Sequence, residues 1–501
     1  MVIIVNGFEI VDNVLVKYKG KAMDVSIPEG VTKIGDRVFL DCEDIVNVII
    51  PNGVVEIGKK AFAYCLSLRS VSMPDTVKHI SEKAFLNCVS LTKVDLPEGL
   101  TYLGTGTFQG CCNLSKVDLP DSLINLEEGT FQECKSLREI HLPKEVTKIS
   151  KNLCYGCTEL VQIDMSNGVT VVEESAFEGC HKLETCNLSN GIKRISDRAY
   201  RCCHRLKGIG FHEGLEYIGK NAFYGCSQLT DIITPQSTTF IGEAAFEQCE
   251  RLNTVEIRGM LTEIEDSTFS NCVSLIDVDI PSSVTRIGRQ AFYNCASIKS
   301  LLLSPKVVII ENEAFSRCGQ LRHVVLPEHI EKIGDFAFHQ CENLIDVVMP
   351  QIINRVGAYI FPISIVSKYS DANGLMIVGG MLINGNSAVG TVSIPETVKA
   401  VAPYAFDNNK NITKVYFSEG VENIGYCAFN NCINIEAVYM PKSVKRIEFD
   451  AFRLFKEYNV LLSGHGKNID KCLNVKFLVH HGSYSHRYAE ECGIKFEIIE
   501  K

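Results

Sequence analysis

A phenylalanine recurs every 23 residues along most of this 501-residue chain. The spacing is unbroken from Phe39 to Phe361, although Cys154 and Tyr200 replace the phenylalanine at two of these positions. A strict period of this length is typical of a solenoid, in which each repeat forms one coil that packs on its neighbours. The period therefore overrides the expectation that a chain of this length folds into several globular domains.

Each slot of the repeat has a physical role. The consensus reads A-F-x-x-C-x-x-L-x-x-V-x-I-P-x-x-V-x-x-I-G-x-x. Val94 and Leu96 alternate with polar residues, which predicts a short half-buried strand, and Pro97 ends that strand because it lacks an amide donor. The V-x-x-I segment predicts a second extended segment, closed by a glycine such as Gly104. The A-F-x-x-C stretch predicts a single helical or 3₁₀ turn with Phe and Cys on one face.

This consensus and spacing resemble the repeats of the BspA-type leucine-rich repeat family over about residues 25 to 455, in some 18 copies. The resemblance implies a leucine-rich repeat solenoid, with a parallel sheet of short strands on one face and short turns or 3₁₀ segments on the other. It also implies protein or surface binding, often in adhesion. It carries over no catalytic residues.

The repeat is interrupted once, and the interruption resembles the start of the chain. Gly7 to Pro28 and Gly374 to Pro395 have the same length, and each contains two apolar segments around a turn, which predicts a hairpin. We therefore expect five parts: an N-terminal hairpin cap (1–28), a main array (29–366), a cap-like hairpin insertion (367–395), a second array (396–455) and a C-terminal cap (456–501). The second hairpin either caps a separate domain or is inserted in one continuous solenoid.

The C-terminal segment leaves the repeat pattern. Ser485 as N-cap and Gly493 just past the end predict a short helix, and residues 494–499 predict a last strand. His480, His481, His486 and Cys492 lie in the same segment, but they lack a recognised metal-ligand spacing. We therefore predict no metal site there.

Most of the 22 cysteines occupy one repeat slot, three residues after the phenylalanine. These fifteen are Cys42, Cys65, Cys88, Cys111, Cys134, Cys157, Cys180, Cys203, Cys226, Cys249, Cys272, Cys295, Cys318, Cys341 and Cys432. A slot this regular predicts a buried ladder of small apolar side chains that point in parallel, so we expect reduced thiols. Cys154 and Cys157 fit a C-x-x-C pattern, but Cys157 belongs to the ladder and Cys154 replaces a ladder phenylalanine.

Composition and motifs exclude several function classes. The net charge of −10 and the lack of a basic run argue against nucleic-acid binding. No window approaches 18 apolar residues, so no membrane span is expected. No phosphate-binding, dinucleotide-binding, metalloprotease or hydrolase motif is present, so we expect neither an enzyme nor a cofactor. Because no signal peptide is recognised and thiols are abundant, a cytoplasmic location is favoured. A cell-surface or secreted location, by a route not visible in the sequence, is the alternative.

Function is expected on the exposed position of the first strand, ten residues after the phenylalanine slot. Three adjacent coils place Leu302, Val325 and Val348 there, and their flanking slot holds Ser300, His323 and Asp346. An apolar row with a polar rim is typical of a partner-binding surface. In the alternative interpretation, the second hairpin covers this row to bury its own residues Leu375, Met376 and Met381.

The function predicted from these features is a non-catalytic scaffold that binds an unidentified protein partner through its exposed sheet face. An adhesin or virulence-type protein at the cell surface is the alternative that the family resemblance implies. A carbohydrate-binding module ranks third, because only Tyr416 and Tyr439 hint at an aromatic row on this face. The acidic column of Asp95, Asp118 and Asp164 is either a site for a basic partner or cations, or a solvated face.

Overall fold

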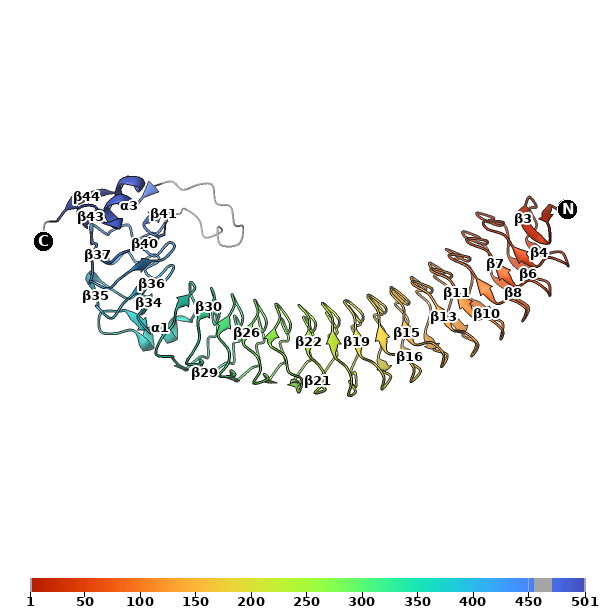
Figure 1. Cartoon of the computed structure of the whole chain (residues 1–501), viewed down its shortest axis with the longest axis horizontal. Helices are drawn as coiled ribbons and strands as arrows, with labels where there is room; N and C mark the ends of the chain where they lie inside the picture. Colours follow the sequence, from red (N-terminus) through yellow and green to blue (C-terminus); the bar gives the residue numbers. More distant parts are fainter. Residues whose placement is uncertain (1, 449, 455–470, 500–501) are drawn as a thin grey trace. The chain divides into compact units, whose positions relative to one another are not determined.

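The computed structural model describes residues 2–448, 450–454 and 471–499. It divides into two compact units, Met1–Pro281 and Ser282–Lys501. Within each unit, short strands of successive repeats pair in parallel, so that the coils form a stack (Figure 1). This architecture confirms the solenoid that the 23-residue period predicts.

In the first unit, each coil contributes to one or both of two strand ladders. The ladder before the proline slot forms the sheet face and contains β4 (Asp24–Ser26), β6 (Asn47–Ile49), β8 (Ser70–Ser72), β10 (Lys93–Asp95), β12 (Lys116–Asp118), β14 (Glu139–His141), β16 (Gln162–Asp164), β18 (Thr185–Asn187), β21 (Asp231–Thr234), β23 (Thr254–Ile257) and β25 (Asp277–Asp279). The two-residue ladder contains β5 (Lys33–Ile34), β7 (Glu56–Ile57), β9 (His79–Ile80), β11 (Tyr102–Leu103), β13 (Asn125–Leu126), β15 (Lys148–Ile149), β17 (Val171–Val172), β19 (Arg194–Ile195), β20 (Tyr217–Ile218), β22 (Phe240–Ile241) and β24 (Glu263–Ile264). Strands β1 (Val2–Val5), β2 (Phe8–Val11) and β3 (Val14–Tyr18) begin the unit.

The first coils of the second unit contain the same two kinds of short strand, and a helix and a hairpin then interrupt the repeat. Its first coils contain β26 (Arg286–Ile287), β27 (Ser300–Leu302), β28 (Ile309–Ile310), β29 (His323–Val325), β30 (Lys332–Ile333), β31 (Asp346–Val348) and β32 (Arg355–Val356). Helix α1 (Ile363–Tyr369) and the hairpin β33 (Met376–Val378) and β34 (Met381–Asn384) follow. The remaining elements are β35 (Gly390–Ile394), β36 (Ala400–Val401), β37 (Ile412–Phe417), β38 (Asn423–Ile424), β39 (Ala437–Tyr439), β40 (Arg446–Ile447), β41 (Arg453–Leu454), β42 (Lys471–Cys472), β43 (Lys476–Val479), α3 (Tyr484–Cys492) and β44 (Lys495–Ile498).

The A-F-x-x-C stretch is a run of tight turns, not the helical turn that its spacing predicts. The amides of Ala61, Ala63 and Cys65 donate to carbonyls three residues earlier in the same coil, at 3.2 Å. The intervening amides of Lys60, Phe62 and Tyr64 donate to the next coil at 2.7–3.0 Å. Lys60 and Tyr64 have φ values of 53° and 61°, and this left-handed conformation turns alternate amides toward the neighbouring coil. Hydrogen bonds between coils thus continue along the turns as well as along the strands.

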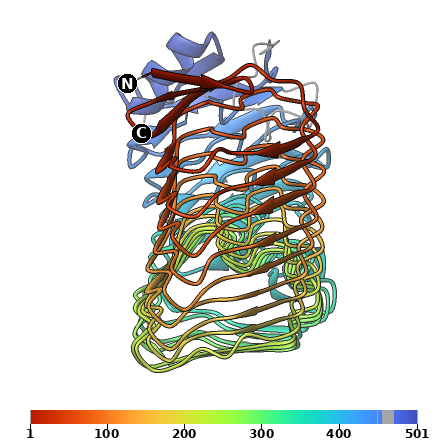
Figure 2. The same cartoon turned by 90° about the vertical axis from the view of Figure 1, so that its right-hand side faces the viewer.

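Two side-chain ladders fill the core of the stack. The rings of Phe39, Phe62, Phe85, Phe108 and Phe131 stack with centroids 4.8–5.9 Å apart. Beside them, ladder thiols donate to the carbonyl of the phenylalanine slot in the preceding coil, as from Cys65 Sγ to the Phe39 carbonyl at 3.2 Å. Burial raises the pKa of the Cys65 thiol to about 12, so it remains a donor. The slot therefore suits cysteine because this residue is small and supplies the hydrogen bond, a role that the sequence interpretation missed. Figure 2 shows the closely stacked coils that these ladders fill.

Both predicted hairpins are present. Strands β2 and β3 pair antiparallel around Asp12 and Asn13, while β33 and β34 pair antiparallel around Gly379 and Gly380. All four turn residues have positive φ, as a tight two-residue hairpin requires. The second strand of each hairpin starts a parallel ladder, β3 with β5 and β34 with β36. The domain boundaries given above stay predictions.

The C-terminal helix differs from its prediction at the N-cap. Ser483, not Ser485, caps α3, since its side chain accepts a hydrogen bond from the His486 amide at 3.2 Å. Ser485 is buried within the helix instead. Gly493 ends the helix with φ 66°, as predicted, and β44 follows. Residues 456–470 of the predicted C-terminal cap lie outside the described residues.

Tyr200 replaces a phenylalanine in the ladder, and its contacts allow the packing of the core to be tested. Tyr200 lies fully buried between Phe177 and Phe223, and its hydroxyl lies 3.3 Å from Cys186 Sγ, where most coils carry an aliphatic residue. We expect Cys186→Val to lower the free energy of unfolding by about 1–3 kcal/mol, because it leaves a buried hydroxyl without its partner. Adding Tyr200→Phe restores the consensus pair and should recover most of this loss. Urea unfolding followed by circular dichroism measures both. A double variant no more stable than Cys186→Val would contradict the pairing.

Candidate functional site

The predicted apolar row is exposed on the sheet face of the second unit. Strands β27, β29 and β31 pair in register, so that Leu302 lies beside Val325 and Val325 beside Val348. Their exposed fractions are 81%, 47% and 51%, whereas the intervening Leu301 and Val324 are buried. These three residues, called the apolar strip below, therefore form a continuous row open to solvent.

A polar column flanks the apolar strip at the start of the same strands. Ser300 pairs with His323, and His323 with Asp346. Helix α1 then reaches this column, because Lys368 Nζ donates to Asp346 Oδ1 at 2.9 Å and the Tyr369 hydroxyl donates to the same oxygen. Hydrogen bonds from Lys368 and Tyr369 lower the pKa of the Asp346 carboxyl. The rim at β31 is thus an ionised but paired carboxylate.

The alternative interpretation, in which the hairpin covers the strip, is wrong. Leu375, Met376 and Met381 are buried, but the strip residues remain exposed. Leu375 belongs to the core cluster of the second array, which also contains Leu382 and Phe406. The hairpin therefore buries its apolar side chains against the coils that follow it in the sequence.

Two further exposed aliphatic residues lie in the same coil as Val348, and the sequence interpretation missed both. Ile345 and Ile352 flank β31 and are 54% and 64% exposed. Ile345 occupies a slot that holds Lys299 and Arg322 in the two preceding coils. A comparison of every slot, not one column, would have found it. Helix α1 is the other unpredicted element near the rim.

The other sequence candidates have ordinary structural roles. Asp95 and Asp118 pair with Lys93 and Lys116 of their own strands at 2.7 and 3.1 Å. His141 Nδ1 lies 2.8 Å from Asp164 Oδ2. The acidic column is therefore a row of solvent-facing pairs, which favours the interpretation as a solvated face.

The aromatic pair on the sheet face is short. Tyr416 and Tyr439 stack with their centroids 6.0 Å apart, and Tyr416 is 41% exposed. They lie in register on β37 and β39. The pair offers a platform for one flat group but no extended aromatic row.

The cysteine and histidine candidates form no metal site in the described part of the chain. Cys154 and Cys157 are fully buried, and Cys157 donates to the Phe131 carbonyl at 3.0 Å as a ladder thiol. Every cysteine whose side chain is described is a free thiol. Among the described residues, no group of three His, Cys, Asp or Glu side chains is arranged to hold a metal ion.

A match to a protein-family model identifies the repeats. The model described as the BspA type leucine rich repeat region (6 copies) matches residues 10–138, 124–253, 240–367 and 373–471, which is most of the chain. The chain belongs to the BspA-type leucine-rich repeat family. The expected resemblance is thereby confirmed, and the chain is a repeat scaffold of this family. No curated protein matches the chain.

Solved structures of other leucine-rich repeat proteins are similar to this chain. A leucine-rich repeat protein from Bacteroides ovatus ATCC 8483 is 21% identical with a TM-score of 0.48, and the match covers 100% of this chain and 98% of that one. A leucine rich cell surface protein from Faecalibacterium prausnitzii A2-165 is 23% identical with a TM-score of 0.40, covering 69% and 94%. The T. pallidum leucine rich repeat protein is 32% identical with a TM-score of 0.32, covering 34% and 82%.

Within the described residues, no helix has the length and apolar character needed to cross a membrane.

The exposure of the apolar strip makes a direct prediction about stability. We expect the variant Leu302→Glu/Val325→Glu/Val348→Glu to remain folded, with a loss of at most about 1 kcal/mol in the free energy of unfolding, because all three side chains face solvent. Leu301→Glu, one position away on β27, should cost at least about 3 kcal/mol because it buries an unpaired charge. Urea unfolding followed by circular dichroism compares them. Equal losses would show that the strip is part of the core.

Proposed function

We propose that this protein is a non-catalytic binding scaffold whose apolar strip contacts a protein partner. The supporting observation is the exposure of Leu302, Val325 and Val348 in register on three adjacent strands. Most other coils place a polar residue at this position, so the departure is local. Exposed apolar surface is costly to keep in water, and a contiguous row with a polar rim is typical of a protein interface.

The rim defines the chemistry of the partner. Within the described residues, the side chains of Ser300 and His323 form no hydrogen bond, although His323 interacts electrostatically with Asp346. Asp346 already accepts hydrogen bonds from Lys368 and Tyr369. The strip itself is flat, because its side chains stand on paired strands. A partner that fits it presents aliphatic or aromatic side chains at the centre, with hydrogen-bonding groups toward His323. The charge on Asp346 needs no new counterion.

Affinity capture from a lysate of the source cell tests this proposal. We expect the native chain to retain a protein that Leu302→Glu/Val325→Glu/Val348→Glu does not, since a carboxylate at each central contact opposes an apolar partner. Truncation of central interface contacts commonly costs about 2 kcal/mol or more, which is at least about a 30-fold loss of affinity.

The matched control is Val55→Glu/Ile124→Glu/Ile433→Glu. These aliphatic residues are 44%, 54% and 52% exposed, yet none lies on β27, β29 or β31. The control variant should capture the same protein as the native chain. If both variants lose the protein, or if neither does, binding does not depend on the strip and the proposal fails.

A further inference from the structure

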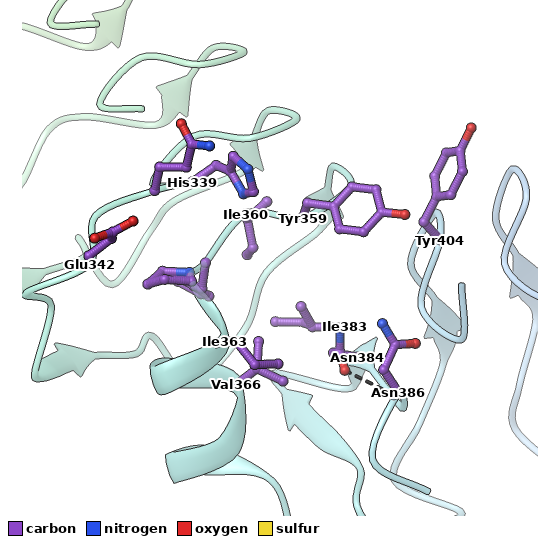
Figure 3. Close-up of a pocket in the computed structure, with 13 residues that line it drawn as sticks. His339, Glu342, Tyr359, Ile360, Ile363, Val366, Ile383, Asn384, Asn386 and Tyr404 are labelled. Atoms are coloured by element: carbon purple, nitrogen blue, oxygen red, sulfur yellow. Dashed lines mark hydrogen bonds between the residues drawn. The ribbon is translucent and has the colours of Figure 1, made fainter. Parts of the chain in front are cut away.

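A cavity of about 370 Å³ lies in the second unit, where the repeat is interrupted (Figure 3). Four segments line it: the turn after β30, the stretch between β32 and α1, the end of β34 and the turn after β36. The coil of Phe361 does not continue as a normal repeat, because α1 turns the chain away at Pro362. The space that a regular coil fills is therefore left partly open.

One wall of the cavity is apolar. Ile360, Val366 and Ile383 are buried and form this wall, whereas Ile363 at its edge is 70% exposed. The lining thus combines one apolar wall with polar side chains on the other walls. Small-molecule sites in proteins have this composition and commonly measure about 300–1,000 Å³.

Two polar side chains reach the cavity. His339 is half-buried, and Asn384 lines the same space at the end of β34. The loop after Asn384 is held in place, because the Asn386 amide donates to Asn384 Oδ1 at 3.0 Å and Asn409 Nδ2 donates to the carbonyls of Gly385 and Ala388 at 2.9 Å. A neutral imidazole and an amide can both exchange hydrogen bonds with an uncharged ligand.

Two tyrosine rings form the adjacent wall. Tyr359 and Tyr404 line the cavity and occupy the left-handed slot two residues before the phenylalanine slot, with φ values of 51° and 55°. Their ring centroids lie 5.4 Å apart. In earlier coils, up to the coil before that of Phe336, this slot holds only polar or small residues: Arg37, Lys60, Lys83, Gly106, Gly129, Asn152, Ser175, Arg198, Asn221, Ala244, Ser267, Gln290 and Glu313. The tyrosines are therefore a local departure from the pattern of this slot.

The lining is close to neutral. Burial lowers the pKa of His339, and burial raises the pKa of Tyr404, so both side chains are uncharged near pH 7. The Tyr359 hydroxyl donates to the buried carboxylate of Asp407, which fixes the ring in place. Glu342 is exposed at the edge, and no Lys or Arg belongs to the lining within the described chain. This environment disfavours phosphate and other anions.

We propose that this cavity binds a neutral, hydroxyl-rich ring, such as one sugar residue of a glycan. Hydroxyl groups can exchange hydrogen bonds with His339 and Asn384, whose side chains line the same space. The apolar face of a sugar ring can pack against the apolar wall and the tyrosine rings. The cavity also accommodates a molecule of this size. The inference is independent of the apolar strip, which lies on β27, β29 and β31 and lines no part of the cavity.

The test titrates the full chain with free glucose, galactose, mannose and N-acetylglucosamine, and separately with tetramethylammonium and inorganic phosphate. Binding is followed by calorimetry, and its location by hydrogen exchange of residues 339–342, 359–366 and 383–386. We expect at least one of the sugars to bind and to slow exchange in these three segments. Asn384→Leu and His339→Ala should each weaken that binding at least about tenfold, because each removes a hydrogen-bonding group.

Controls separate the cavity from the rest of the molecule. The variant Leu302→Glu/Val325→Glu/Val348→Glu should bind the sugar as the native chain does. His339 is only half-buried, so His339→Ala remains informative if Asn384→Leu does not fold. The proposal is overturned if none of the four sugars binds, if only tetramethylammonium or phosphate binds, or if sugar binding survives in the folded variants.

Discussion

The hydrogen bonding between coils is the constraint on which the rest of this structure depends. Because the residues at two positions of each turn are left-handed, alternate amides of the A-F-x-x-C stretch reach the next coil while the others close the turn. The coils are then close enough for phenylalanine rings to stack, and for a thiol to reach the carbonyl of the preceding coil. The cysteine and phenylalanine slots are consequences of this spacing. Tyr200, which replaces one of the phenylalanines, has its hydroxyl beside the thiol of Cys186.

The repeated residues form the backbone hydrogen bonds between coils and fill the core. We therefore expect function at residues that depart from the consensus. The apolar strip and the cavity are both such departures, and both lie in the second unit. They differ in chemistry. The strip is a flat row of aliphatic side chains suited to a protein surface, whereas the cavity combines amides, a neutral imidazole and tyrosine rings around a small volume. Under the two proposals above, one scaffold would hold two different ligands.

The apolar segments around Asp12 and around Gly379 predict both hairpins. The spacing of the phenylalanines predicts the solenoid and its parallel ladders, because a side-chain period directly reports which positions face the core. The same reasoning places Leu302, Val325 and Val348 on the surface. It does not reveal the left-handed turn residues, since Lys60 and Tyr64 carry no side-chain signature of positive φ. Nor does it predict the cavity, which α1 and the end of β34 line together with turns of the adjoining coils.

The most direct test of the central claim is site-specific photo-cross-linking on the intact chain. A photoreactive amino acid is placed at Val325, at the centre of the strip, and at Ile124, which is similarly exposed in the first unit. If the strip is the binding surface, irradiation in lysate of the source cell gives a dominant adduct from position 325 that position 124 does not give, and unlabelled native chain competes it away. The same adducts from both positions, or no competition, would contradict the account.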